Sequence, residues 1–131
     1  MGTKNITPLL WFSVLAKGRR WTVHLSAADL TEELGCGTPA GERIAGLADP
    51  VTHSIYVDAG QSEKDVDSTT LHEILHVCLA TTYVWPAERV VAALEQPLWR
   101  ILKSLGFAWP EKPKKWRTLQ RHAKRVNTLE K

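Results

Sequence analysis

The sequence predicts an α+β domain in which a small, mostly antiparallel sheet of about three strands packs on two helices, with a third, basic helix at the C-terminus. Alternating apolar residues indicate short strands in the first half of the chain. Apolar residues at helical spacing indicate two longer segments after residue 62, and Lys and Arg gather in residues 111–131. With 131 residues and 44% hydrophobic content, the chain can bury a single core.

Three segments with alternating apolar residues are expected to form the strands: residues 20–25, 42–48 and 53–58. In the first of them, Trp21, Val23 and Leu25 share one face. The other two flank residues 49–52, whose Asp-Pro-Val-Thr sequence is typical of a turn. We therefore expect the second and third strands to form an antiparallel hairpin.

Two further segments before the second half of the chain are expected to be helical or turn-like. Residues 9–16 are apolar, with Thr7 and Pro8 before them and Gly18 after them, which predicts a short amphipathic helix. Residues 26–34 are interpreted as a short helix or turn.

The sequence favours a cytoplasmic protein with no membrane partner. No window approaches the apolar length of a membrane span, and residues 9–16 lack a small-x-small cleavage site. Cys36 and Cys78 are too few for a disulfide framework, so both are expected to be reduced. A thiolate zinc ligand at Cys36 is a less favoured alternative.

The most informative motif is His-Glu-x-x-His, formed by His72, Glu73 and His76. It lies in a segment that predicts a helix from about residue 63 to about residue 81, because acidic residues begin it and neither Gly nor Pro interrupts it. Two histidines four positions apart share one helical face and can bind one Zn²⁺, with the intervening Glu placed as a general base. The alternative is a structural histidine pair facing the core, which leaves Glu73 without a role.

A catalytic zinc site needs a third protein ligand and an open position for water. The chain after residue 86 predicts a second helix that Gly106 ends, with apolar residues following a 3.6-residue period. Glu88 and Glu95 lie seven positions apart on nearly one face of this helix. Both can point toward the first helix, only one is required, and the other is then a solvated surface residue.

Together these segments resemble a known family. Residues 44–58, an acidic linker, His72-Glu-Ile-Leu-His76 and Glu88-Arg-Val-Val-Ala-Ala-Leu resemble small phage and prophage zinc metallopeptidases of the gluzincin type. The chain is more distantly similar to ImmA/IrrE-like domains, and the resemblance covers about residues 19–105. In such families a Glu at the start of the next helix, before an apolar pair, completes a two-His-one-Glu site. The resemblance thus implies a zincin-like domain with His72, His76 and Glu88 as zinc ligands.

These observations predict a zinc metallopeptidase that hydrolyses peptide bonds of an unidentified protein substrate, phage or prophage associated by resemblance. Glu73 is the expected catalytic residue, accepting a proton from water and delivering it to the leaving amine. In zincins an exposed edge strand pairs with the substrate backbone, and either hairpin strand is a candidate. Four residues are unranked candidates for stabilising the oxyanion: Tyr83, Tyr56, His53 and Arg89.

The charge is divided between a domain at residues 1–110 and a basic extension at residues 111–131. The first carries 9 Lys and Arg against 12 Asp and Glu, a charge of −3, and the extension carries 8 against 2, a charge of +6. Apolar residues at helical spacing in the extension predict a helix that docks on the domain or binds nucleic acid or an acidic partner. The alternative function is therefore a catalytically silent binding module, associated with nucleic acid through this extension.

Overall fold

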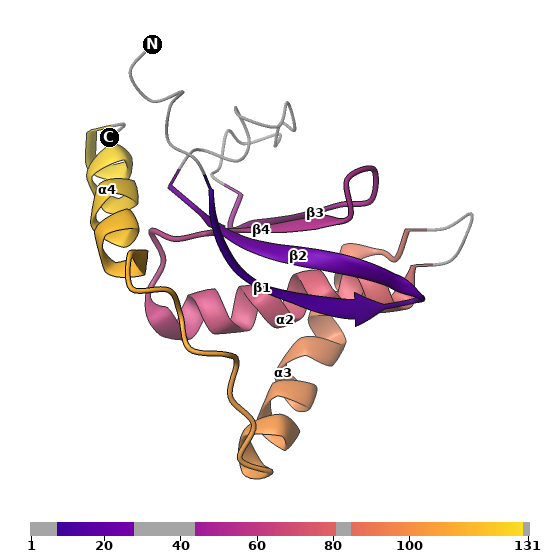
Figure 1. Ribbon diagram of the computed structural model, residues 1–131. Coiled ribbons are helices and arrows are strands. Elements are labelled where there is room, and N and C mark those ends of the chain that lie inside the picture. The colour runs from indigo at the N-terminus through magenta and orange to yellow at the C-terminus, as the bar shows by residue number, and fades with distance from the viewer. Residues whose placement is uncertain (1–7, 28–43, 81–84, 130–131) are drawn as a thin grey trace.

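The computed structural model describes residues 8–27, 44–80 and 85–129, and in this part of the chain a four-stranded mixed sheet packs with three helices (Figure 1). The elements follow one another along the chain in this order: β1 (Leu9–Ala16), β2 (Arg19–Ser26), β3 (Gly46–Asp49), β4 (Ser54–Asp58), α2 (Glu63–Leu79), α3 (Glu88–Ser104) and α4 (Trp116–Leu129). The class is α+β, as predicted. None of the described helices is long and apolar enough to cross a membrane.

The sheet has the strand order β1-β2-β4-β3, with an antiparallel hairpin at each end. The predicted hairpin is confirmed as β3 and β4. The two hairpins join through β2 and β4, which pair in parallel from Thr22 opposite Ser54 to Ser26 opposite Asp58. The sheet is therefore mixed, and it has one strand more than the three that the sequence predicts.

The additional strand is β1, so the helix predicted for residues 9–16 is wrong. Lys17 and Gly18 have φ values of 54° and 76°, the left-handed pair that a two-residue hairpin turn requires. The pairing register shifts between Leu10 and Phe12, which interrupts the alternation that would otherwise indicate a strand. Gly18 is thus part of the turn of a hairpin and does not end a helix.

The main core lies between the sheet and α2. Val23 and Leu25 of β2 and Val57 of β4 are fully buried against Val66 and Val77 of α2. This packing fixes α2 beneath the sheet, as Figure 1 shows. The motif helix is thereby held along its length.

A second, smaller core joins α3 to α2 through Val91, which is fully buried against Leu71 and Leu75. The predicted second helix is confirmed, and it contains Pro97. Gly106, with a φ of 84°, follows its end, and Phe107 donates a backbone hydrogen bond to Leu102. Only one face of α3 packs on the domain.

Helix α4 docks on the domain through Trp116, Gln120 and Ala123, which are buried. The side-chain amide of Gln120 donates to the carbonyl of Gln61, at 2.8 Å. Just before the helix, the Lys112 ammonium lies over the rings of Trp11 and Trp116, 4.9 and 5.2 Å from their centroids. It also pairs with Asp67 at 2.8 Å.

Of the two cysteines, the structure describes Cys78. Cys78 is a free, exposed thiol on α2. Cys36 and residues 28–34 lie outside the described residues.

Candidate metal centre

His72 and His76 lie one turn apart on α2, and the local sequence explains why this segment is helical. Ser62 caps the helix by accepting a hydrogen bond from the Asp65 backbone N–H, at 3.2 Å. At the other end, the Lys17 ammonium of the β1–β2 turn donates to the Ala80 carbonyl at 2.8 Å. Both ends are thus satisfied, and the two imidazoles project toward the start of α3.

Glu88, the first residue of α3, meets both histidines. One carboxylate oxygen contacts His72 Nε2, and the other lies 2.8 Å from His76 Nε2. Ligand atoms of these three residues all lie within 4.8 Å of one another. Two imidazole nitrogens and a carboxylate oxygen are a donor set that suits Zn²⁺, so this group can hold a metal ion.

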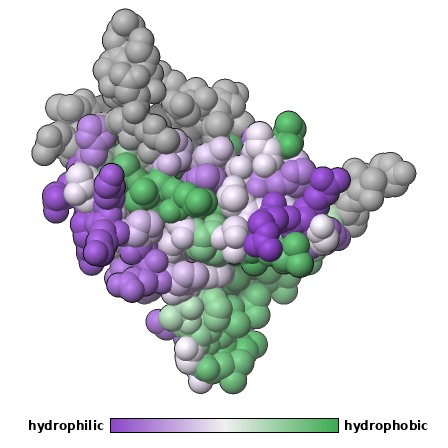
Figure 2. All heavy atoms as spheres, in the orientation of Figure 1, coloured by the Kyte–Doolittle hydropathy of each residue, from purple (hydrophilic) through white to green (hydrophobic). Residues whose placement is uncertain are grey.

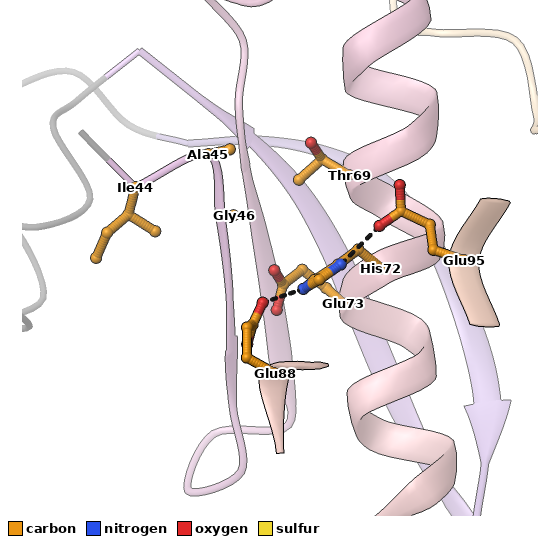
Figure 3. Close-up of a pocket in the computed structure, with 8 residues that line it drawn as sticks. All are labelled: Ile44, Ala45, Gly46, Thr69, His72, Glu73, Glu88 and Glu95. Atoms are coloured by element: carbon orange, nitrogen blue, oxygen red, sulfur yellow. Dashed lines mark hydrogen bonds and ion pairs between the residues drawn. The ribbon is translucent and has the colours of Figure 1, made fainter. Parts of the chain in front are cut away.

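Glu95 lies on the other side of the His72 ring. Its carboxylate accepts a hydrogen bond from His72 Nδ1 at 2.7 Å (Figure 3). It accepts another from the Ser68 hydroxyl at 2.6 Å. A proton held on Nδ1 leaves the Nε2 lone pair of a neutral His72 free to bind a metal. Of the two glutamates that the spacing left open, Glu88 therefore faces the candidate ligand atoms and Glu95 orients a ring.

The close contacts between His72 and the two glutamates shift the pKa values of His72 and Glu88. Burial lowers the pKa of His72, but hydrogen bonds to Glu95 and Glu88 outweigh it, so its pKa is raised. Burial likewise raises the pKa of Glu88, but the nearby histidines outweigh it and its pKa is lowered. Without metal, the raised pKa of His72 favours its protonated ring between the carboxylates of Glu88 and Glu95. A metal ion bound here would supply the positive charge that the proton on His72 Nε2 otherwise supplies.

Glu73 is 7% exposed and lies beside Gly46 at the start of β3. Burial, with smaller contributions from the Glu88 and Glu95 carboxylates, raises its pKa to about 7, and His72 opposes the rise. Its carboxylate oxygen would lie 3.1 Å from a Cβ at Gly46. The Glu73 carboxylate therefore lies against the backbone of β3 at a position where a side chain larger than that of glycine would crowd it.

Two adjoining hollows open on this group, with volumes of about 290 and 330 Å³. Both are lined by Gly46, Glu73 and Glu88, and Figure 3 shows these residues facing the same space. The second is also bordered by Trp85, whose ring stacks on His76 with centroids 5.6 Å apart and planes at 5°. The Glu73 carboxylate and the candidate metal ligands are therefore reached from the same open space.

The neighbours of His76 differ from those of His72. His76 Nδ1 is buried and has no hydrogen-bond partner in the part of the chain that the structure describes. The His76 ring is therefore held by stacking against Trp85 and by Glu88 at Nε2, and it has no counterpart of the Glu95 contact at Nδ1.

The sequence did not single out Trp85, Gly46 or Ser68. Gly46 offered a signal, because an isolated glycine inside a predicted strand indicates a close backbone approach. Trp85 and Ser68 have no such local signal, since their roles depend on how α3 crosses α2.

Three of the four candidates for an oxyanion donor lie in the described part of the chain. Tyr56 stacks on His24 with centroids 5.2 Å apart, and His53 meets the edge of the Trp21 ring. Arg89 is exposed on α3, and Tyr83 lies outside the described residues.

Comparison with known proteins adds no relative: no protein-family model, curated protein or solved structure matches this chain.

Proposed function

We propose that this chain is a zinc-dependent metallopeptidase of the His-Glu-x-x-His type, with His72, His76 and Glu88 as the metal ligands. The observation that carries the proposal is the approach of these three residues to within 4.8 Å, with the buried Glu73 carboxylate beside them. The resemblance to gluzincin-type phage and prophage enzymes points the same way. A structural histidine pair would not require a buried carboxylate at the mouth of a hollow.

The chain's own residues supply the acid-base chemistry. Bound Zn²⁺ supplies Lewis acidity, polarising the scissile carbonyl and favouring ionisation of water near neutral pH. Glu73 accepts a proton from the attacking water on its carboxylate as the new C–O bond forms. It then delivers that proton to the amide nitrogen as the C–N bond breaks. In the metal-free protein burial raises the pKa of Glu73 to about 7. A bound cation would lower this pKa and favour the ionised carboxylate that accepts the proton.

The substrate backbone is proposed to pair with β3. Among the strands that the structure describes, β3 is at one end of the sheet and β4 lies inside it, so of the two hairpin strands β3 has the edge without a neighbouring strand. Gly46 and Leu47 of β3 line the hollow beside Glu73. An extended peptide added to this edge would run past the candidate metal ligands, with its carbonyls within reach of the site.

Glu95 and Ser68 act on the site through His72. Their hydrogen bonds hold the Nδ1 proton and the ring plane, so that Nε2 points to the ion. Glu95 is therefore a positioning residue, and its loss should weaken the metal site without removing a ligand.

The test measures zinc and cleavage together. Wild type purified without chelator should carry about one Zn²⁺ per chain, and Glu88→Ala should lose it because one of three protein ligands is removed. Glu95→Gln should retain zinc with affinity about 10- to 100-fold weaker, as for other partners of ligating histidines. Glu73→Gln should keep the metal and lose about 10²- to 10⁴-fold in cleavage of peptides selected from a random library.

The matched control is Glu111→Gln, which changes an exposed glutamate away from the site. Wild type without bound metal after purification in excess zinc would refute the metal centre. Full cleavage by zinc-loaded Glu73→Gln would refute the mechanism and leave the metal centre standing.

A second candidate function is nucleic-acid binding through α4. Docking of Trp116 leaves Lys114, Lys115, Arg117 and Arg121 exposed along the outer side of this helix and its lead-in. These exposed cations outnumber Glu111, the acidic residue of the lead-in, and such an excess of positive charge is the electrostatic feature of a phosphate-binding surface.

A further inference from the structure

Helix α3 presents a second apolar face that does not pack on the domain. Its members, three or four positions apart, are Val90, Leu94, Pro97, Ile101 and, at the helix end, Leu105. Val90, Leu94, Ile101 and Leu105 are 45%, 43%, 55% and 77% exposed. Figure 2 shows the result, a hydrophobic surface over the part of the molecule that α3 occupies. We call these five residues the α3 stripe.

A column of cations runs beside the α3 stripe. Arg89, Arg100 and Lys103 are exposed and fall on one side of the helix, because separations of eleven and fourteen residues are close to whole numbers of turns. The only acidic residues of α3 are Glu88 and Glu95, and both are bound to His72. The Glu95 side chain is 15% exposed, whereas Glu88, the first residue of the helix, is 71% exposed. Beyond Glu88, the exposed surface of α3 is therefore apolar along one side and positive along the next.

We propose that the α3 stripe is a docking surface for an amphipathic helix of a partner protein, with apolar residues on one face and Asp or Glu along one flank. The spacing of the stripe is the one that lets two helices interlock their side chains. Because Arg89, Arg100 and Lys103 are positively charged, we expect the acidic flank of the partner helix to lie beside them. This docking does not depend on the peptidase function, because neither the metal ligands nor Glu73 belong to the stripe.

A second copy of this chain fits the surface poorly. The stripe is about 22 Å long at 1.5 Å per residue and about 10 Å wide, a few hundred Å². A stable interface buries roughly 800 Å² per partner. In an antiparallel pair of identical helices, equivalent flanks face each other, so the cation column would meet itself and repel.

An anionic membrane surface also fits less well than a helix. Membrane-surface helices carry Trp or Phe at the interface and cations on both sides of the apolar face. The α3 stripe contains no aromatic residue, and Trp99, the aromatic residue of α3, packs toward the second core. The cations lie along one flank only.

The test uses a designed, fluorescently labelled peptide of about 20 residues, long enough to form a helix, with Leu at heptad spacing and Glu along one flank. A matched peptide carries Lys in place of Glu. Binding is followed by anisotropy in metal-free protein, so that it reports docking and not cleavage. We expect wild type to bind the Glu peptide in the micromolar range, typical of small transient interfaces, and the Lys peptide at least tenfold more weakly.

Single substitutions on the protein locate the site. Ile101→Gln should weaken binding about tenfold, because it removes an apolar contact at the middle of the stripe. Arg100→Gln should weaken it by a smaller factor that disappears at high salt. The matched control is Leu15→Gln, at a 66% exposed apolar residue of β1, which should leave binding unchanged.

Four results with the peptides or vesicles would overturn the proposal. The first three are that wild type does not bind the Glu peptide, that it binds both peptides equally, and that Ile101→Gln binds the Glu peptide as tightly as wild type does. The fourth is that wild type binds phosphatidylcholine–phosphatidylglycerol vesicles but not the peptide, and that Ile101→Gln abolishes the binding to vesicles. A dimer in sedimentation that Ile101→Gln dissociates would assign the stripe to a second copy instead, and would equally overturn it.

Discussion

Replacing Gly46 with alanine probes a close approach between β3 and α2. A Cβ at this position would lie 2.5 Å from Thr69 Cγ2 and 3.1 Å from Glu73 Cγ. The first separation is far inside van der Waals contact, so strand and helix must move apart.

The expected cost follows from two opposing effects. Overpacking of this kind costs about 1–3 kcal/mol, and replacing Gly by Ala in a strand restores about 0.5–1 kcal/mol of backbone entropy. We therefore expect Gly46→Ala to lower the free energy of unfolding by about 1–2 kcal/mol. Urea denaturation measures this, with an unchanged m-value if the folded and unfolded states keep their compactness.

Thr69→Ser supplies the decisive control. It removes the clashing methyl, at a cost of about 0.8 kcal/mol for one buried carbon, and keeps the hydroxyl that donates to Gln61. If the clash is the cause, the double variant Gly46→Ala/Thr69→Ser should be about as stable as Thr69→Ser alone, a coupling of about 1–2 kcal/mol. Strictly additive effects of the two substitutions would refute the reasoning. The contact with Glu73 remains in the double variant, so zinc content and cleavage should recover less than stability.

The remaining predictions concern charge. In metal-free protein, the raised pKa of Glu73, about 7 against a reference of 4.5, means that the folded state holds this proton more tightly. The contribution of Glu73 to the free energy of unfolding is fully present below pH 4.5 and falls by about 3 kcal/mol as the pH rises to about 7. The free energy of unfolding of Glu73→Gln should therefore depend less steeply on pH than that of wild type. Parallel pH profiles of the two proteins would contradict this. If α4 binds nucleic acid, Arg117→Gln/Arg121→Gln should reduce the slope of log affinity against log salt by about 1.4 on single-stranded DNA, without loss of fold. An unchanged slope in a single-stranded DNA titration would exclude these two residues.

The motif and its helix were predictable because their signals are local. His72, Glu73 and His76 need only the 3.6-residue period, and the acidic first turn indicates where α2 begins. The choice between Glu88 and Glu95 was not predictable from spacing, since both lie on one face and their distance from His72 depends on how α3 crosses α2. Resemblance favoured Glu88, and the structure brings it to both histidines.

The sheet was harder to predict because its pairing is long-range. β2 and β4 pair in parallel although Thr22 and Ser54 are 32 residues apart, and no local pattern encodes that contact. β1 was missed for a local reason, the register shift that breaks its alternation. The docking of α4 through Trp116 was one of two open alternatives, since an apolar stripe with cations around it suits a docked helix and a free one equally well.

The register shift in β1 also bears on how the molecule avoids unwanted association. In residues 8–27, 44–80 and 85–129, the sheet ordered β1-β2-β4-β3 has two outer strands, and no further described strand pairs with the outer edge of either. β1 is the longer and exposes Leu10 and Leu15, the composition that promotes aggregation between copies. Its bulge twists the ladder and spoils a continuous match with a second strand. β3 is regular but only four residues long, so it can pair with a short segment without nucleating a fibre.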